Sequence, residues 1–169
     1  MADRVSASIV IGGSLSAMAF AELVALIGDE ALSTEWDGEA FELSHRTVGK
    51  PLSLYAHEVA WGHFEALESW CAQNGVPFAR WSGGYSGQWG PERMVHQGDG
   101  TTISYAVTED DTVVIPREML EELGSFEAAL AYFAAADVTV PPLVVEGDLP
   151  EAGITTGSTL VAQGQPHVE

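Results

Sequence analysis

Positive charge is the scarcest feature of this sequence. Its 169 residues include six lysines and arginines against 25 aspartates and glutamates, which gives a formal net charge of −19 at neutral pH. The basic residues are scattered along the chain as Arg4, Arg46, Lys50, Arg80, Arg93 and Arg117. Because nucleic-acid binding depends on clustered cations that neutralise phosphates, this composition argues against direct contact with nucleic acid.

Cysteine and long hydrophobic runs are also scarce. The single cysteine, Cys71, excludes an intramolecular disulfide and a zinc site built from cysteines. The longest apolar stretches are interrupted by Glu22 and Gly28, so they are too short to cross a bilayer. The first four residues, Met-Ala-Asp-Arg, lack the basic region and apolar segment of a signal peptide. We therefore expect a cytoplasmic protein without a membrane segment.

Hydrophobic residues make up 46% of the chain, which is ordinary for a globular protein. Alternation and helical spacing predict a single α+β domain over residues 1–145, with a mainly antiparallel sheet and packed helices. The first half is compatible with a ferredoxin-like split β-α-β arrangement. Residues 146–169, rich in Gly, Thr and Pro, are predicted to form a tail or peripheral arm. The expected strands are 6–11, 52–59, 78–81, 94–97, 102–108 and 112–116. The expected helices are one that ends near residue 27 and is capped by Ser14 or Ser16, then 62–74 and 117–123, and one through residue 136 that is capped by Ser125.

Four of the five tryptophans lie between residues 52 and 93, together with His57, His63 and Cys71. The two histidines are six residues apart across an expected strand-to-helix junction, whereas a helical zinc motif needs them four apart. Cys71 follows Leu67 by four residues within an apolar helical stripe, which indicates a structural thiol. We predict no catalytic residue, no cofactor and no metal.

The glycine-rich loop 82–91 carries Tyr85 and Trp89, and such aromatic side chains on loops favour a contact surface. An alternative function follows from the same segment. A small-ligand binder or enzyme would use a Trp/Gly-rich pocket close to His57, Glu58 and His63.

Acidic residues gather in two segments that contribute −6 each to the net charge. The first acidic segment, residues 29–42, contains no basic residue, and the second, residues 99–122, contains only Arg117. On the expected helix 117–123 the glutamates share one face without intervening lysines, so we expect them to be unpaired. Because a merely solvated surface normally mixes the two signs of charge, this segregation favours a partner of opposite charge.

These observations predict a non-catalytic acidic protein that inhibits a basic nucleic-acid-handling protein by charge mimicry. The partner surface would most naturally be the nucleic-acid-binding groove of a nuclease or defence complex. In size, acidity and single-domain organisation the chain resembles the anti-CRISPR and anti-restriction inhibitors of phages and plasmids, and toxin immunity proteins use the same physics. A structural or adaptor domain with environmental acidity is a third interpretation. The predicted partner-binding residues are Asp29, Glu30, Glu35, Trp36, Asp37, Glu39, Glu42, Tyr85, Trp89, Glu109, Asp110, Asp111, Glu118, Glu121 and Glu122.

Overall fold

A five-stranded antiparallel sheet forms the centre of the computed structural model, which describes residues 2–149. Its strands are arranged in the order β3-β1-β4-β5-β6, with every neighbouring pair antiparallel. Their bounds are β1 (Arg4–Ile11), β3 (Leu52–Ala60), β4 (Phe78–Ser82), β5 (Glu92–His96) and β6 (Thr102–Ala106). Together with four α-helices, this sheet confirms the predicted α+β class.

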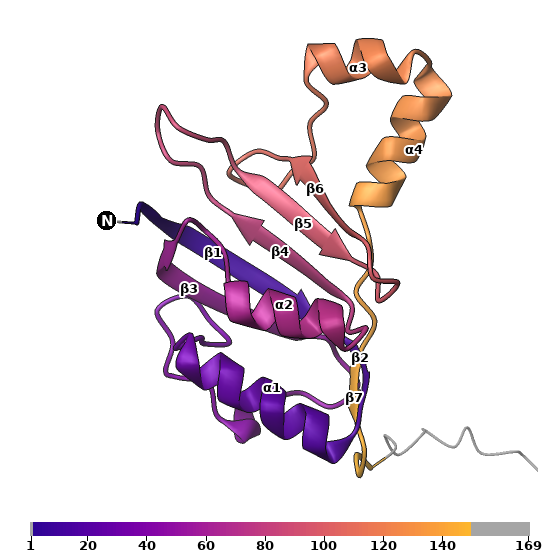
Figure 1. Ribbon diagram of the computed structural model, residues 1–169. Coiled ribbons are helices and arrows are strands. Elements are labelled where there is room, and N and C mark those ends of the chain that lie inside the picture. The colour runs from indigo at the N-terminus through magenta and orange to yellow at the C-terminus, as the bar shows by residue number, and fades with distance from the viewer. Residues whose placement is uncertain (1, 150–169) are drawn as a thin grey trace, which may run out of the picture.

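Helices α1 (Ala17–Asp29) and α2 (Glu65–Gln73) lie across one face of the sheet (Figure 1). The side chain of Ser16 accepts a hydrogen bond from the backbone N–H of Ala19 and caps the start of α1. The main core lies between these helices and the sheet, where Leu23 of α1 and Leu67 of α2 join Ile9 of β1. We call this side of the sheet the helix face, and the opposite side the open face.

A second, smaller core lies on the open face at the β5–β6 end of the sheet. Helices α3 (Arg117–Leu123) and α4 (Phe126–Ala136) extend beyond β6, away from α1 and α2 (Figure 1). Tyr105 of β6 is buried there against Tyr132 of α4, with their ring centroids 5.1 Å apart. The chain then returns to the first half, where β7 (Leu143–Val145) pairs in parallel with β2 (Gly13–Leu15).

The connection between β3 and β4 is a split β-α-β unit. Both strands pair antiparallel with β1, so they run parallel to one another on either side of it and are joined through α2. The assignment of this half to a ferredoxin-like fold stays a prediction.

Three local predictions are wrong. Residues 112–116 do not form a strand and contribute only an isolated bridge between Val113 and Val107. The predicted helix 62–74 begins at Glu65, after Gly62 with φ of +70°. Strict alternation along residues 52–59 predicts that Val59 lies on the face opposite Leu52 and Leu54. It lies instead on the helix face, because the pairing register of β1 and β3 shifts at a β-bulge, where Glu58 has φ of +57°.

The beginning of the predicted tail contacts the domain. The N–H of Glu146 donates to the carbonyl of Leu15, and Arg46 forms an ion pair with Asp148. That pair, with a backbone hydrogen bond from Val145, lowers the pKa of Asp148 to about 2. The remainder of the predicted tail, residues 150–169, lies outside the described residues. No helix within residues 2–149 combines the length and apolar composition needed to cross a membrane.

Candidate functional site

The first acidic segment leaves α1 and passes along the free edge of β3. The N–H of Ser33 donates to the carbonyl of Tyr55, and the N–H of Tyr55 donates back to Ser33, at 3.1 and 2.7 Å. Leu32 is fully buried, and its carbonyl accepts the N–H of Phe41. The segment is therefore fixed at both ends, and residues 35–40 between these ties form an exposed loop.

Within this loop the N–H of Gly38 donates to the carbonyl of Glu35 and closes a turn. Asp37 adopts a φ of +57°, a left-handed conformation that is uncommon for residues other than glycine. A Cβ on Gly38 would lie 2.3 Å from the Ser33 hydroxyl, so a side chain at this position would force that hydroxyl to move. The turn thus fixes the backbone from which the exposed carboxylates project.

Within the described part of the chain, few positively charged groups lie close to the carboxylates of the first acidic segment. Among the described residues, the one ion pair that involves this segment joins Asp37 Oδ1 to His57 Nε2 at 3.4 Å. Burial raises the pKa of Glu30 above its ordinary value, and neighbouring carboxylates raise it further, namely those of Glu68, Asp29 and Glu65. The segment therefore produces a local field that favours a cationic partner.

Trp36 lies at the centre of this surface. Its ring packs on Tyr55 and His57, with centroid distances of 4.9 and 4.8 Å, and meets Trp81 edge-on at 6.4 Å, so it covers the open face of the sheet. The ring remains 41% exposed. A shallow pocket of about 370 Å³ lies beside it and is bordered by Arg4, Glu30, Glu35, Asp37, Tyr55 and Glu58, among others.

Ser6 lies beside His57, although nothing in the sequence indicated that it would belong to this site. Its hydroxyl lies 2.7 Å from Nδ1 of His57, whose other ring nitrogen faces Asp37. Such an order of hydroxyl, imidazole and carboxylate is that of an activated nucleophile. Here, however, the Asp37 side chain is 86% exposed, so water screens its interaction with His57. We interpret the contacts as holding His57 under Trp36.

The second acidic segment is partly neutralised. Arg93 forms ion pairs with Asp111 and with Asp137 beyond the segment, at 2.9 and 2.8 Å. On α3 the prediction of unpaired glutamates is wrong for Glu121, which accepts a hydrogen bond from Arg117 at 2.9 Å. Glu109 is also engaged, because it accepts the N–H of Gly84 and secures the glycine-rich loop. Asp110, Glu118 and Glu122 remain exposed on this side of the molecule.

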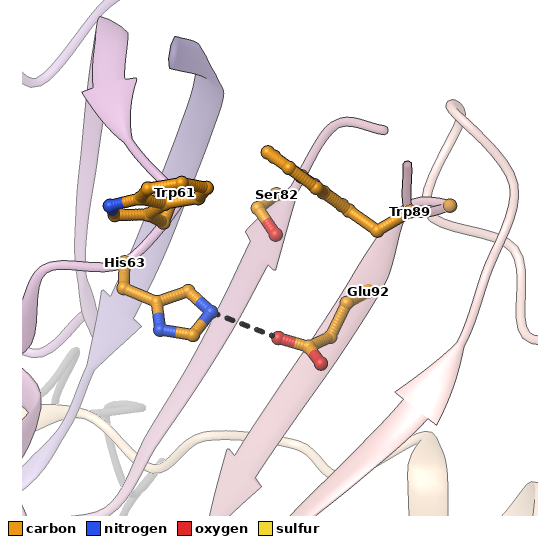
Figure 2. Close-up of a pocket in the computed structure, with 6 residues that line it drawn as sticks. Trp61, His63, Ser82, Trp89 and Glu92 are labelled. Carbon is orange, nitrogen blue, oxygen red and sulfur yellow. Dashed lines mark ion pairs between the residues drawn. The ribbon is translucent and has the colours of Figure 1, made fainter. Parts of the chain in front are cut away.

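The structure separates the residues of the alternative pocket. His57 and Glu58 border the pocket beside Trp36, whereas His63 borders a different pocket of about 290 Å³. The second pocket, which we call the indole pocket, is lined by Trp61, His63, Ser82, Trp89, Gly90 and Glu92 (Figure 2). One pocket containing all three predicted residues is therefore not formed, because the bulge and the turn at Gly62 send their side chains in different directions.

Below the indole pocket lies a buried ion-pair network. Arg80 is 0% exposed, and its Nε and Nη2 atoms lie 2.9 Å from carboxylate oxygens of Glu68 and Glu92 respectively. The remaining nitrogen, Nη1, donates to the hydroxyl of Ser82. Glu68 also accepts the backbone N–H of Phe64 at the start of α2, so the network joins the helix to the sheet.

Comparison of the chain with protein-family models, curated proteins and solved structures finds no match. The function must therefore be argued from the geometry of this chain. Within the part of the chain that the structure describes, no three His, Cys, Asp or Glu side chains are grouped so that they could hold a metal ion.

Cys71 is expected to be unreactive in the folded protein. Burial, together with the nearby carboxylate of Glu68, raises the pKa of its thiol to about 12. Because only the thiolate reacts, alkylation by iodoacetamide at mildly alkaline pH should be at least about 100-fold slower in native protein than in urea-unfolded protein. Rates of mass increase measure this directly. Equally fast labelling of both states would show an accessible thiol and would contradict a structural role.

Proposed function

We propose that this chain is a non-catalytic acidic binding protein that covers a basic groove on another protein and competes with the nucleic acid that the groove normally holds. Such a partner would be a nuclease or a component of a defence complex. The observation that carries the proposal is the first acidic segment, an exposed loop whose carboxylates flank the half-exposed Trp36 in sequence and whose start is tied to β3 through Ser33 and Tyr55. Carboxylates would take the place of phosphates in the groove.

The arrangement favours fast and specific binding on physical grounds. An excess of negative charge steers a cationic surface towards the segment and raises the association rate. The two backbone ties at Ser33 and the turn at Gly38 hold the loop in place, so less conformational entropy is lost on binding. Trp36, packed on Tyr55, provides a rigid aromatic anchor of the kind that dominates interface energies.

The second acidic segment supports the proposal less strongly. Its field is reduced by the ion pairs of Arg93 and Arg117. Three of its glutamates lie on α3, which extends beyond β6, at the opposite edge of the sheet from β3 (Figure 1). We assign it a contribution to long-range steering, and we assign the contact surface to the first segment.

Charge reversal within the two segments tests this division. The double variant Glu35→Lys/Glu39→Lys changes the first segment, and Glu118→Lys/Glu122→Lys makes the same change in net charge on α3. Partners captured from cells that carry this gene should bind the first variant at least about tenfold more weakly, because rows of close charge pairs are lost. The α3 variant should lose less than about threefold, and binding of the unchanged protein should fall steeply with added salt.

Competition completes the test. Duplex DNA or RNA at increasing concentration should displace the protein from the captured partner. Equal losses for the two variants would mean that net charge alone drives association. Undiminished binding of Glu35→Lys/Glu39→Lys would remove the first acidic segment from the interface and overturn the proposal.

A further inference from the structure

The indole pocket is built differently from the acidic surface. Trp61 and Trp89 approach with ring centroids 5.7 Å apart and planes inclined by 44°. In Figure 2 the two indoles lie on one side of the pocket and His63 and Glu92 on the other, with the Ser82 hydroxyl between them. A ligand in this space would meet two aromatic rings on one side and a carboxylate on the other.

Backbone geometry holds the aromatic side of the pocket in place. Trp61 has φ of +56°, which is an uncommon conformation for a bulky residue and is found preferentially at functional positions. The following Gly62 passes so close to β4 that a Cβ there would lie 2.6 Å from the Cβ of Ser82. Trp89 is supported by Tyr85, whose ring stacks on it at 5.2 Å. The backbone that carries Trp61 and the ring of Trp89 therefore have defined positions, while Trp61 itself is 50% exposed.

The charge lining the pocket is negative. Burial raises the pKa of Glu92, but the hydrogen bond from Ser104 and the guanidinium of Arg80 outweigh it, so the pKa is lowered and the carboxylate stays ionised. Arg80 itself is fully buried and already engaged by Glu68 and Ser82, so it offers no donor to a ligand. The Oε1 atom of Glu92 is buried between Arg80 and His63 and makes no aligned hydrogen bond among the described residues, and Oε2 accepts the hydroxyl of Ser104, so the carboxylate acts on a ligand through its charge. An anionic ligand is thereby disfavoured.

We propose that the indole pocket binds a small organic cation of the quaternary ammonium class, held by the faces of Trp61 and Trp89 and by the carboxylate of Glu92. Tryptophan is the strongest aromatic partner for such cations, and a quaternary ammonium needs no hydrogen-bond acceptor. The volume of about 290 Å³ suits a ligand of few atoms. The site lies on the Ser82 side of the sheet, whereas Trp36 covers the Trp81 side, so it is independent of the proposed protein-binding surface.

Choline and its tert-butyl analogue, in which carbon replaces the ammonium nitrogen, distinguish charge from shape. Isothermal titration calorimetry of the full chain should give saturable binding of choline and at least about tenfold weaker binding of the neutral analogue. Trp89→Leu and Glu92→Gln should each weaken choline binding by about tenfold, while Trp89→Phe, which keeps an aromatic face, should lose less. Trp36→Leu, on the other side of the sheet, is the matched control and should bind choline normally.

Circular dichroism and thermal unfolding of each variant show whether a loss of choline binding arises from misfolding. The comparison of choline with its neutral analogue uses the unchanged protein, so it does not depend on any variant. Equal affinity for choline and its neutral analogue would show an apolar pocket without charge selectivity. Absence of saturable choline binding, or choline binding unaffected by Trp89→Leu in folded protein, would overturn the proposal. Neither result would alter the outcome of the charge-reversal experiment on the first acidic segment.

Discussion

The variant Arg80→Met is expected to destabilise the protein by about 3–5 kcal/mol, because it leaves two carboxylates at a buried site without their cation. Arg80 is fully enclosed, and Glu68 and Glu92 each lie 2.9 Å from its guanidinium nitrogens. Methionine fills much of the same volume but supplies no charge and no donor for Ser82. Urea unfolding followed by circular dichroism would measure the loss as a lower midpoint at a similar slope.

A triple variant separates the cost of uncompensated charge from the loss of packing. Adding Glu68→Gln and Glu92→Gln to Arg80→Met removes both stranded charges, and glutamine at position 68 keeps an oxygen for the N–H of Phe64. Most of the lost stability should return, since replacing a whole buried ion network is far less costly than breaking it. If the triple variant is no more stable than Arg80→Met, the lost stability comes from packing and not from uncompensated charge.

Arg117→Met is the matched surface control. Arg117 also pairs with a glutamate at 2.9 Å, but its side chain is 86% exposed, so water already solvates both charges. We expect a change below about 1 kcal/mol. Similar effects at Arg80 and Arg117 would contradict the argument, because burial is the main physical difference between the two sites.

The sequence predicted those features that depend on local patterns. Alternation in residues 6–11 identified β1. Serine before an apolar helical stripe identified the start of α4, where Ser125 accepts a capping hydrogen bond, and restricted the cap of α1 to Ser14 or Ser16, of which Ser16 caps the helix. These signals lie within a few residues of the feature that they predict. Tertiary contacts did not have to be known, and the α+β class followed from the order of the elements.

Features that depend on register could not be predicted. The bulge opposite Ser6 reverses the alternation of β3, so Val59 enters the core and His57 reaches a hydroxyl 51 residues away in the sequence. Proximity in sequence suggested one site for His57, Glu58 and His63, whereas the turn at Gly62 divides them between two pockets. No local pattern encodes such a division.

Arg80 is an intermediate case. Its position two residues after Phe78 in an alternating strand places it on the core side, which was a signal for a buried cation. The identity of its partners was not available, because Glu68 and Glu92 lie 12 residues away on either side, on α2 and β5. The same limit applies to the first acidic segment. Its charge was evident from composition, but its ties to β3 and the position of Trp36 required the structure.

Gly12→Ala is expected to destabilise the protein by about 3 kcal/mol, the upper end of the usual cost of overpacking. Gly12 connects β1 to β2, and a Cβ at this position would lie 1.8 Å from the backbone carbonyl oxygen of Pro141 and 2.8 Å from a methyl group of Val140. Both are part of the segment that returns from α4. A side chain could avoid this contact by changing its rotamer, but a backbone oxygen cannot. The alanine can therefore be accommodated only if the whole returning segment moves.

Gly28→Ala provides the control within the same part of the chain. A Cβ at Gly28 meets no atom within 4 Å, and the residue lies inside α1, so alanine should stabilise the protein by about 0.5–1 kcal/mol. If Gly12→Ala lowers the stability and Gly28→Ala raises it, the loss at Gly12 comes from the lack of space for a Cβ there. Similar, small effects would mean that the returning segment adapts at little cost.

Amide hydrogen exchange would show which parts of the sheet lose protection in Gly12→Ala. The returning segment is held by the N–H of Gly13, which donates to Pro142, and by Leu143, which is fully buried in the main core. If the segment detached locally, amides of β7 would exchange faster while those of β1 and β4 kept their protection. Because detachment would expose Leu143 and break its backbone bonds to Lys50 and Arg46, we expect instead that protection falls throughout the sheet. The returning segment would then belong to the same cooperative unit as β1, although the two lie at opposite ends of the described chain.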